Sequence, residues 1–350
     1  MDLLESARQT IRAAMDHSLP LQERVASTGK TENPMFNLIE KAQQLLAAGE
    51  YEKVIDIQAN QGEPGDTELA NLIGWAHVMQ GNALADLAET KTGAEADRLL
   101  IQAGETYAAA LEIKPDLHDA LLNWGNALAM QASTKTEAEA DRLWTLAGEK
   151  YAAALAIKPD KHDAFYNWGN ALADQARTRT GAEADRLFSQ AGERYAAALE
   201  IKPDLHDALF FWGSAIAAQA GTNTGAEADR LWTLAGEKYA AALAIKPDMH
   251  EAYNAWTEAL LIQAEGKSET EVEDLFRQAQ EYASKAESLV PGVGAYNLAC
   301  VEARRGNEDD CRAWLIKSKE SGTLPSRNHL LQDSDLSSVR QRDWFQSFLD

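Results

Sequence analysis

Apolar residues in the central part of the chain recur at spacings of three and four, the period of an α-helix. Within residues 116–159 they form two stripes, separated by the polar stretch 133–136. The first stripe predicts a helix over about 117–133, here called helix A. Its members are Ala120, Trp124, Ala127 and Leu128, with the polar Gln131 at the end of the same stripe. The second stripe predicts a helix over about 137–157, here called helix B. Its members are Ala140, Leu143, Trp144, Ala147, Tyr151 and Ala154.

This pair of stripes returns every 44 residues, so the chain contains an internal repeat. Three kinds of residue keep the register: Tyr107, Tyr151, Tyr195 and Tyr239; Trp124, Trp168, Trp212 and Trp256; Pro115, Pro159, Pro203, Pro247 and Pro291. The stretch LWTLAGEKYAAALAIKPD at 143–160 is repeated letter for letter at 231–248. A fixed period of this size predicts a stacked array in which each unit buries an apolar face against its neighbours. Most of the chain is therefore scaffold.

Residues at the expected helix ends predict where the helices begin. Thr136 and Glu139 form a capping-box pattern at the start of helix B, and the same pair recurs at 92/95, 180/183 and 224/227. Asp116, which follows a proline, is predicted to cap helix A. Gly125 and Gly148 lie inside the helices, where glycine is unfavourable, and predict close backbone approach of a neighbouring helix.

These residues resemble the tetratricopeptide repeat (TPR) family, whose helix pairs carry a large residue and Gly in helix A. The family then has Ala, an aromatic residue, Ala and a closing Pro in helix B. The matching positions here are Trp124-Gly125, Leu128, Ala147, Tyr151, Ala154 and Pro159. The unit has 44 residues instead of 34, and HDALLNWGNALA at 118–129 looks like the similarly lengthened repeats of plant-type mitochondrial import receptors. The resemblance implies an all-α, right-handed solenoid of stacked antiparallel helix pairs.

The two ends depart from the 44-residue unit, which predicts four regions. Residues 1–33 are expected to form an N-terminal helix and linker, and 34–66 a shorter TPR-like repeat. Residues 67–291 form the array of long repeats, beginning with a long helix over 67–90. Residues 292–350 resemble the end-of-group module of bacterial TPR arrays, with a helix pair at 295–322 and a tail at 329–349.

Charge and composition narrow the class of partner. The chain has 33 basic and 55 acidic residues, a formal net charge of −22, which argues against nucleic-acid binding. No stretch approaches the roughly 20 apolar residues needed to span a bilayer. Only Cys300 and Cys311 occur, which is typical of a reducing compartment. We expect a cytoplasmic, bacterial protein.

The sequence offers no catalytic constellation, so we expect no enzyme activity, no cofactor and no metal. The seven histidines include one in the first turn of each predicted helix A. Equivalent positions on successive repeats lie about 10 Å or more apart, too far to share one metal ion. A structural surface role is therefore expected for these histidines.

The resemblance implies that a partner lies in the concave groove lined by the A helices. The corresponding positions are Asp119, Leu122, Asn123, Asn126, Asp163, Tyr166, Asn167, Asn170, Asp207, Phe210, Phe211 and Ser214. None is basic, which disfavours the acidic chaperone tails that the family's carboxylate clamp binds. Amide, aromatic and acidic side chains favour a basic or amphipathic protein segment.

The sequence leaves two functions open. The first is a non-enzymatic scaffold or adaptor that binds a partner peptide or helix in the groove. The alternative is a regulatory or inhibitory subunit that restrains a separately encoded enzyme, for example in a bacterial stress or defence system. A subunit of that kind should bury well over ~1,600 Å² against a folded partner.

Overall fold

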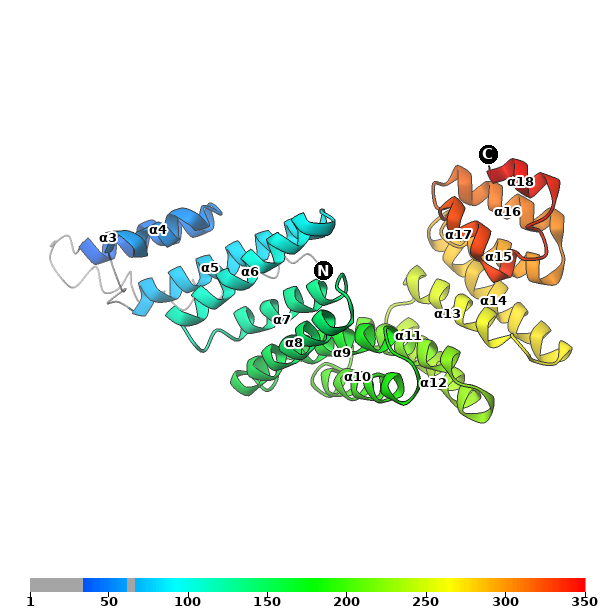
Figure 1. Cartoon of the computed structure of the whole chain (residues 1–350), viewed down its shortest axis with the longest axis horizontal. Coiled ribbons are helices and arrows are strands. Elements are labelled where there is room, and N and C mark those ends of the chain that lie inside the picture. The colour runs from blue at the N-terminus through cyan, green and yellow to red at the C-terminus, as the bar shows by residue number, and fades with distance from the viewer. Residues whose placement is uncertain (1–33, 62–66, 350) are drawn as a thin grey trace.

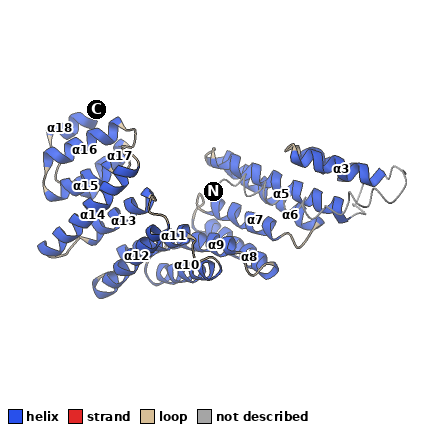
Figure 2. Ribbon diagram, turned by 180° about the vertical axis from the view of Figure 1, so that it is seen from behind, coloured by secondary structure: helices blue, strands red, loops and turns tan. Residues whose placement is uncertain are grey.

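A computed structural model of the chain describes residues 34–61 and 67–349, and every regular element within them is helical (Figures 1 and 2). The elements are α3 (Pro34–Ala47), α4 (Tyr51–Gln61), α5 (Thr67–Glu89), α6 (Gly93–Ile113), α7 (His118–Ala132), α8 (Glu137–Ile157), α9 (His162–Arg177), α10 (Gly181–Ile201), α11 (His206–Thr222), α12 (Gly225–Ile245), α13 (His250–Gln263), α14 (Glu269–Leu289), α15 (Ala295–Arg305), α16 (Glu308–Glu320), α17 (Arg327–Gln332), the 3₁₀ helix η1 (Ser334–Leu336) and α18 (Asp343–Leu349). The all-α prediction is confirmed. The helix and linker predicted within 1–33 lie outside the described residues, and the four-region division stays a prediction.

Helices α7 and α8 match the predicted helix A and helix B to within one residue, but two capping predictions are wrong. Thr136 has the extended backbone of an N-cap, yet its side chain makes no capping hydrogen bond, and neither do Thr92, Thr180 and Thr224. Helix A begins after Leu117 rather than Asp116, because Leu117 is buried and its N–H closes a turn onto the Lys114 carbonyl. A complete capping box occurs instead at Ser268 and Glu271, before α14.

Within each repeat, the glycine of helix A makes room for an aromatic ring of helix B. A Cβ placed on Gly125 would lie 2.7 Å from Cε1 of Tyr151, whose side chain is only 1% exposed. Gly81, Gly169 and Gly213 face Tyr107, Tyr195 and Tyr239 in the same way. The predicted close approach is therefore made mainly by a tyrosine ring and not by a neighbouring backbone.

Successive repeats are joined by a second glycine. Gly148 in α8 faces the indole of Trp168 in α9, and the Trp168 ring stacks on Tyr151 at 6.3 Å between centroids. The same joint pairs Gly104 with Trp124, Gly192 with Trp212 and Gly236 with Trp256. The tyrosines are core residues, as predicted, whereas these tryptophans are half-buried. Lys150, Arg194 and Lys238 cover the rings of Trp124, Trp168 and Trp212.

A polar contact, here called the inter-repeat clasp, also links a B helix to the A–B turn of the following repeat. A carboxylate near the start of helix B meets a residue in the next A–B turn, 38 residues later. The four pairs are Asp97 with Lys135, Asp141 with Arg179, Asp185 with Asn223, and Asp229 with Lys267. Three are ion pairs, and the third in chain order is a neutral hydrogen bond.

The array bends so that α10 and α12 lie on its outer side and α9 and α11 lie toward the inner side (Figure 1). At the C-terminal end, α15 to α18 form a compact group that packs on α13 and α14. Leu261 and Phe276 of the last long repeat share one apolar cluster with Leu315, Leu336 and Phe345 of this group. The group therefore covers the apolar face that the last repeat would otherwise expose.

Candidate functional site

The candidate site is the A-helix surface, formed by the inner faces of α7, α9 and α11. These helices contact one another in sequence along the inside of the bend, so their side chains form one surface. The first histidine of each helix contacts the acidic residue that follows it, for example His162 Nε2 and Asp163 Oδ1 at 3.1 Å. These contacts agree with the structural role expected for the histidines.

An aromatic patch is the main apolar feature of the A-helix surface. Tyr166 of α9 meets Phe211 of α11 edge to face, with ring centroids 5.9 Å apart, and Phe211 meets Phe210 in the same manner at 4.9 Å. Phe211 is 37% exposed, and Tyr166 and Phe210 are half-buried. The patch rests on the buried Tyr195 and Tyr239. The structure thus brings three predicted site residues from two repeats together.

Three of the predicted site residues, Asn126, Asn170 and Ser214, each bind the scaffold through one side-chain oxygen atom. The Tyr151 hydroxyl donates to Asn126 Oδ1 at 2.9 Å, and that of Tyr195 donates to Asn170 Oδ1 at 2.8 Å. Ser214 Oγ occupies the same position toward Tyr239, at 3.2 Å. Burial raises the pKa of these tyrosines, that of Tyr239 to about 12, so their hydroxyls stay protonated donors.

The acidic residues in the first turns are partly neutralised by neighbouring bases. Asp119 lies 3.2 Å from His118 Nδ1 and 3.1 Å from Nζ of Lys161, which belongs to the next repeat. Burial by itself would raise the pKa of Asp119, but the close contact with His118 and the charge of Lys161 outweigh it, and the pKa is lowered. Asp163 contacts Lys161 and its own histidine. Within residues 34–61 and 67–349, Asp207 forms an ion-pair contact with His206 alone, at 3.3 Å, so the A-helix surface is most acidic near α11.

The remaining predicted residues contribute less exposed area. Leu122 is 6% exposed and belongs to the apolar cluster around Tyr151, so it offers a partner little contact. Asn123 donates to Asn82 Oδ1 at 2.8 Å, on the preceding repeat. Asn167 is half-buried on α9. The two ends of the surface therefore differ: small amides over α7 and aromatic rings over α9 and α11.

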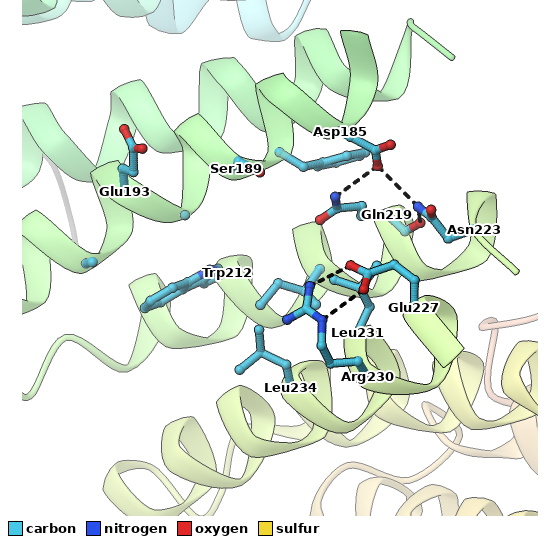
Figure 3. Close-up of a pocket in the computed structure, with 14 residues that line it drawn as sticks. Asp185, Ser189, Glu193, Trp212, Gln219, Asn223, Glu227, Arg230, Leu231 and Leu234 are labelled. Carbon is cyan, nitrogen blue, oxygen red and sulfur yellow. Dashed lines mark hydrogen bonds and ion pairs between the residues drawn. The ribbon is translucent and has the colours of Figure 1, made fainter. Parts of the chain in front are cut away.

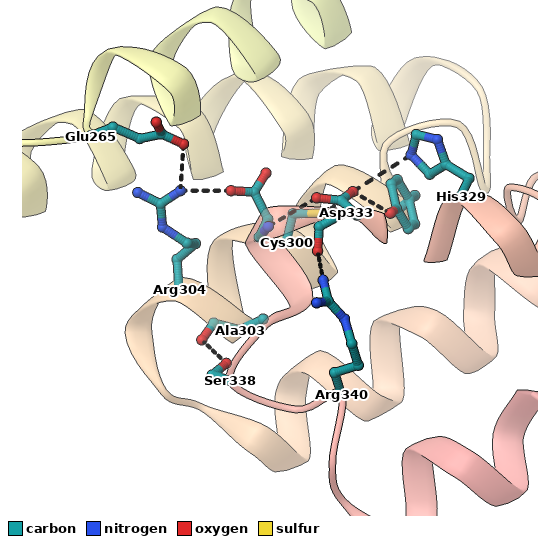
Figure 4. Close-up of polar contacts among 10 residues, drawn as sticks. Glu265, Cys300, Ala303, Arg304, His329, Asp333, Ser338 and Arg340 are labelled. Carbon is teal, nitrogen blue, oxygen red and sulfur yellow. Dashed lines mark hydrogen bonds and ion pairs between the residues drawn. The ribbon is translucent and has the colours of Figure 1, made fainter. Parts of the chain in front are cut away.

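A second polar group, around Cys300, lies in the C-terminal helices (Figure 4). Cys300, Asp333 and Asp335 place ligand-type atoms within 4.8 Å of one another. Asp333 accepts a hydrogen bond from Tyr296, and Asp335 pairs with Arg304 Nη1 at 2.7 Å. Burial raises the pKa of Cys300 well above its usual value, which keeps the thiol protonated. Because the carboxylates already have partners, this group ties the C-terminal tail to α15.

Sequence reasoning missed the inter-repeat clasp and the outer surface that surrounds it. A basic residue recurs at 135, 179 and 267, and an aspartate recurs at 97, 141, 185 and 229. Both series are visible in the printed chain. The signal was their constant separation of 38 residues, which pairs each aspartate with the turn of the following repeat.

Comparisons with known proteins agree with this architecture. The family model of the plant-specific mitochondrial import receptor subunit TOM20 matches residues 118–207, and no curated protein matches the chain. Among solved structures, the C-terminal part of a TPR repeat-containing protein from Cytophaga hutchinsonii has a TM-score of 0.52 at 11% identity, covering 83% of this chain and 97% of that chain. At this identity the likeness shows the fold, and the chain has the TPR fold.

Two further solved structures are similar at lower scores. PilW, a widely conserved type IV pilus biogenesis factor, has a TM-score of 0.48 at 16% identity, covering 74% of this chain and 97% of its own. YrrB, a TPR protein with an unusual peptide-binding site, has a TM-score of 0.41 at 16% identity, covering 69% and 94%. Among the described residues, none of the helices combines the length and apolar character of a membrane span.

Proposed function

We propose that the chain is a non-enzymatic scaffold whose A-helix surface binds a segment of another protein. The TPR fold and the partial match to an import receptor family support a role in protein interaction. The observation that carries the proposal is Phe211 of α11, a large aromatic side chain that is 37% exposed and contacts Tyr166 of α9. Aromatic residues at the centre of a surface are typical anchors for a protein partner.

The surroundings of the aromatic patch favour a basic, amphipathic segment. An apolar side chain of the partner can cover Phe211 and the edge of Tyr166, which remain accessible beside the buried tyrosines. Asp163 and Asp207, in the first turns of the same helices, supply negative charge close by, and the chain as a whole carries −22. Complementary charge speeds association and rejects acidic competitors.

The proposal includes a cytoplasmic setting, in bacteria as the C-terminal sequence pattern suggests. Both cysteines are free and buried in the C-terminal helices. Free buried thiols are typical of proteins kept in a reducing compartment.

The test compares Phe211→Ala with Ile101→Ala, a matched loss of an exposed apolar side chain on helix B. Ile101 is 48% exposed on α6, away from the A-helix surface. A partner is first identified by affinity purification from the native host with mass spectrometry, and binding of the purified pair is then measured by calorimetry. We expect Phe211→Ala to weaken binding at least tenfold, about 1.4 kcal/mol, with Ile101→Ala unchanged. Unchanged binding by Phe211→Ala, or equal loss in both variants, would place the partner elsewhere.

Changing Asn126 or Asn170 would be a poorer test. Each accepts the hydrogen bond of a buried tyrosine hydroxyl, so an alanine there leaves a buried donor unpaired at a cost of about 1–3 kcal/mol. A loss of binding could then follow from a loosened repeat. Phe211 avoids this difficulty because its ring lies at the surface and makes no hydrogen bond.

A further inference from the structure

A pocket opens on the outer side of the array, between the B helices α10 and α12, with α11 beneath it (Figure 3). Its volume is about 580 Å³. The floor is apolar and includes Phe188, Trp212 and Leu231. The rim is polar and carries Asp185, Glu193 and Glu227. The pocket is thus apolar at its base and acidic around its mouth.

One rim residue interrupts the series of inter-repeat clasps. Lys135, Arg179 and Lys267 each place a cation on the aspartate of the preceding repeat. The equivalent residue beside Asp185 is Asn223, which donates an amide hydrogen bond at 3.1 Å and brings no charge. The pocket therefore lies where this repeat lacks the cation that its neighbours possess.

Nothing else in the described part of the chain replaces that cation. The Asp185 carboxylate receives Gln219 Nε2 at 2.9 Å, on the same Oδ1 atom that Asn223 uses, and forms no ion pair. Arg230, the basic residue of the rim, is held by both oxygens of Glu227, at 3.0 and 2.6 Å. Figure 3 shows these two separate groups, with Asp185 on one wall and the Arg230–Glu227 pair on the other.

We propose that this pocket receives an arginine or lysine side chain from a partner protein, which supplies the missing clasp to Asp185. Such a side chain has an aliphatic stem that suits the apolar floor and a charged head that suits the rim. An acidic side chain would meet Asp185 and Glu193, and an aliphatic one would leave Asp185 without a cation. The volume exceeds that of one side chain, so the flanking residues of the partner segment also fit. This site is separate from the A-helix surface and does not depend on the function proposed for it.

One substitution would supply the missing cation beside Asp185 from within the chain. Asn223→Lys introduces the residue present at positions 135 and 267, where a lysine pairs with the aspartate 38 residues earlier. The variant is therefore expected to fold normally and to form an internal Asp185–Lys clasp. Asp185→Asn is the complementary variant, because it removes the charge while keeping the hydrogen-bonding shape of the side chain.

The probe is a capped pentapeptide, acetyl-Ser-Leu-Arg-Leu-Ser-amide, and its control has norleucine in place of arginine. Binding is measured on the full chain by the ¹⁵N-indole NMR signal of Trp212, assigned with Trp212→Phe. We expect the arginine peptide to shift this signal at millimolar concentration and the norleucine peptide to bind at least fivefold more weakly. Asn223→Lys and Asp185→Asn should each weaken the arginine peptide at least fivefold. Equal binding of the two peptides, wild-type affinity in Asn223→Lys, or shifts confined to other tryptophans would overturn the proposal.

Discussion

The contact between Gly125 and Tyr151 leads to a quantitative prediction about packing within a repeat. An alanine at position 125 would place its methyl group 2.7 Å from Cε1 and 2.9 Å from Cδ1 of the Tyr151 ring. The ring is 1% exposed and is anchored by its hydroxyl to Asn126, so it has little room to move. Gly148 and Gly221 are the matched controls. The nearest atom to an added methyl is 3.5 Å away at Gly148, and none lies within 4 Å at Gly221.

The expected changes in the free energy of unfolding follow from two opposing terms. Replacing glycine by alanine in a helix stabilises it by up to about 1 kcal/mol. At position 125, overpacking costs about 1–3 kcal/mol, and displacing the ring also weakens a hydrogen bond worth about 1 kcal/mol. Gly125→Ala should therefore destabilise the protein by about 1–3 kcal/mol. Gly148→Ala and Gly221→Ala should be neutral or stabilising by up to about 1 kcal/mol.

The assay is urea unfolding followed by circular dichroism, combined with amide hydrogen exchange in α7 and α8. The exchange data are needed because repeats of a stacked array can open locally, so that a global unfolding curve averages over them. Gly125→Ala should speed exchange in its own repeat, whereas the two controls should not. Equal or greater stability of Gly125→Ala relative to Gly221→Ala would refute the assignment of this glycine to ring packing.

Two further predictions concern the C-terminal group and Asp119. Deleting 295–349 uncovers Leu261 and Phe276, so light scattering should detect aggregation or calorimetry a lower melting temperature; a monomer with an unchanged melt would show that the segment is an appendage. The pKa of Asp119 is lowered on folding, so its charge contributes stability above the ordinary value of about 3.9, and this contribution is lost as pH falls through the folded pKa. Asp119→Asn should therefore unfold at lower urea near pH 7 and lose stability less steeply below about pH 4; parallel pH profiles for both proteins would contradict this.

The helices could be predicted from the sequence because their ends carry strong local signals. Thr136 and Pro159 bracket one uninterrupted helical pattern, and α8 extends from Glu137 to Ile157. The failure of Thr136 to cap α8 could not be predicted from the same signal, because a cap needs one side-chain rotamer as well as a suitable residue. Ser268 and Glu271 have a similar pattern and do form the capping box.

The site was less predictable, because a residue's partner lies far along the chain. Asn126 has the position of a ligand-binding amide, yet its oxygen is taken by a tyrosine hydroxyl 25 residues later. Gly125 indicates that a neighbouring group approaches the helix closely, but it does not identify that group as the ring of Tyr151. The unusual Asn223 becomes informative only once Asp185, 38 residues earlier, is seen beside it.

The glycine–tryptophan joint has a consequence for how this array can change in length. Each joint uses one glycine from the earlier repeat and one tryptophan from the later repeat, so any two adjacent copies that carry them are compatible. Adding or removing 44 residues in register would lengthen or shorten the inner surface and keep the same glycine–tryptophan joint between neighbouring repeats. The next joint would fall 44 residues after Gly236 and Trp256. Those positions hold Gln280 and Cys300, so neither the glycine nor the tryptophan is present there. The sequence itself therefore sets the number of long repeats, and with it the length of the A-helix surface.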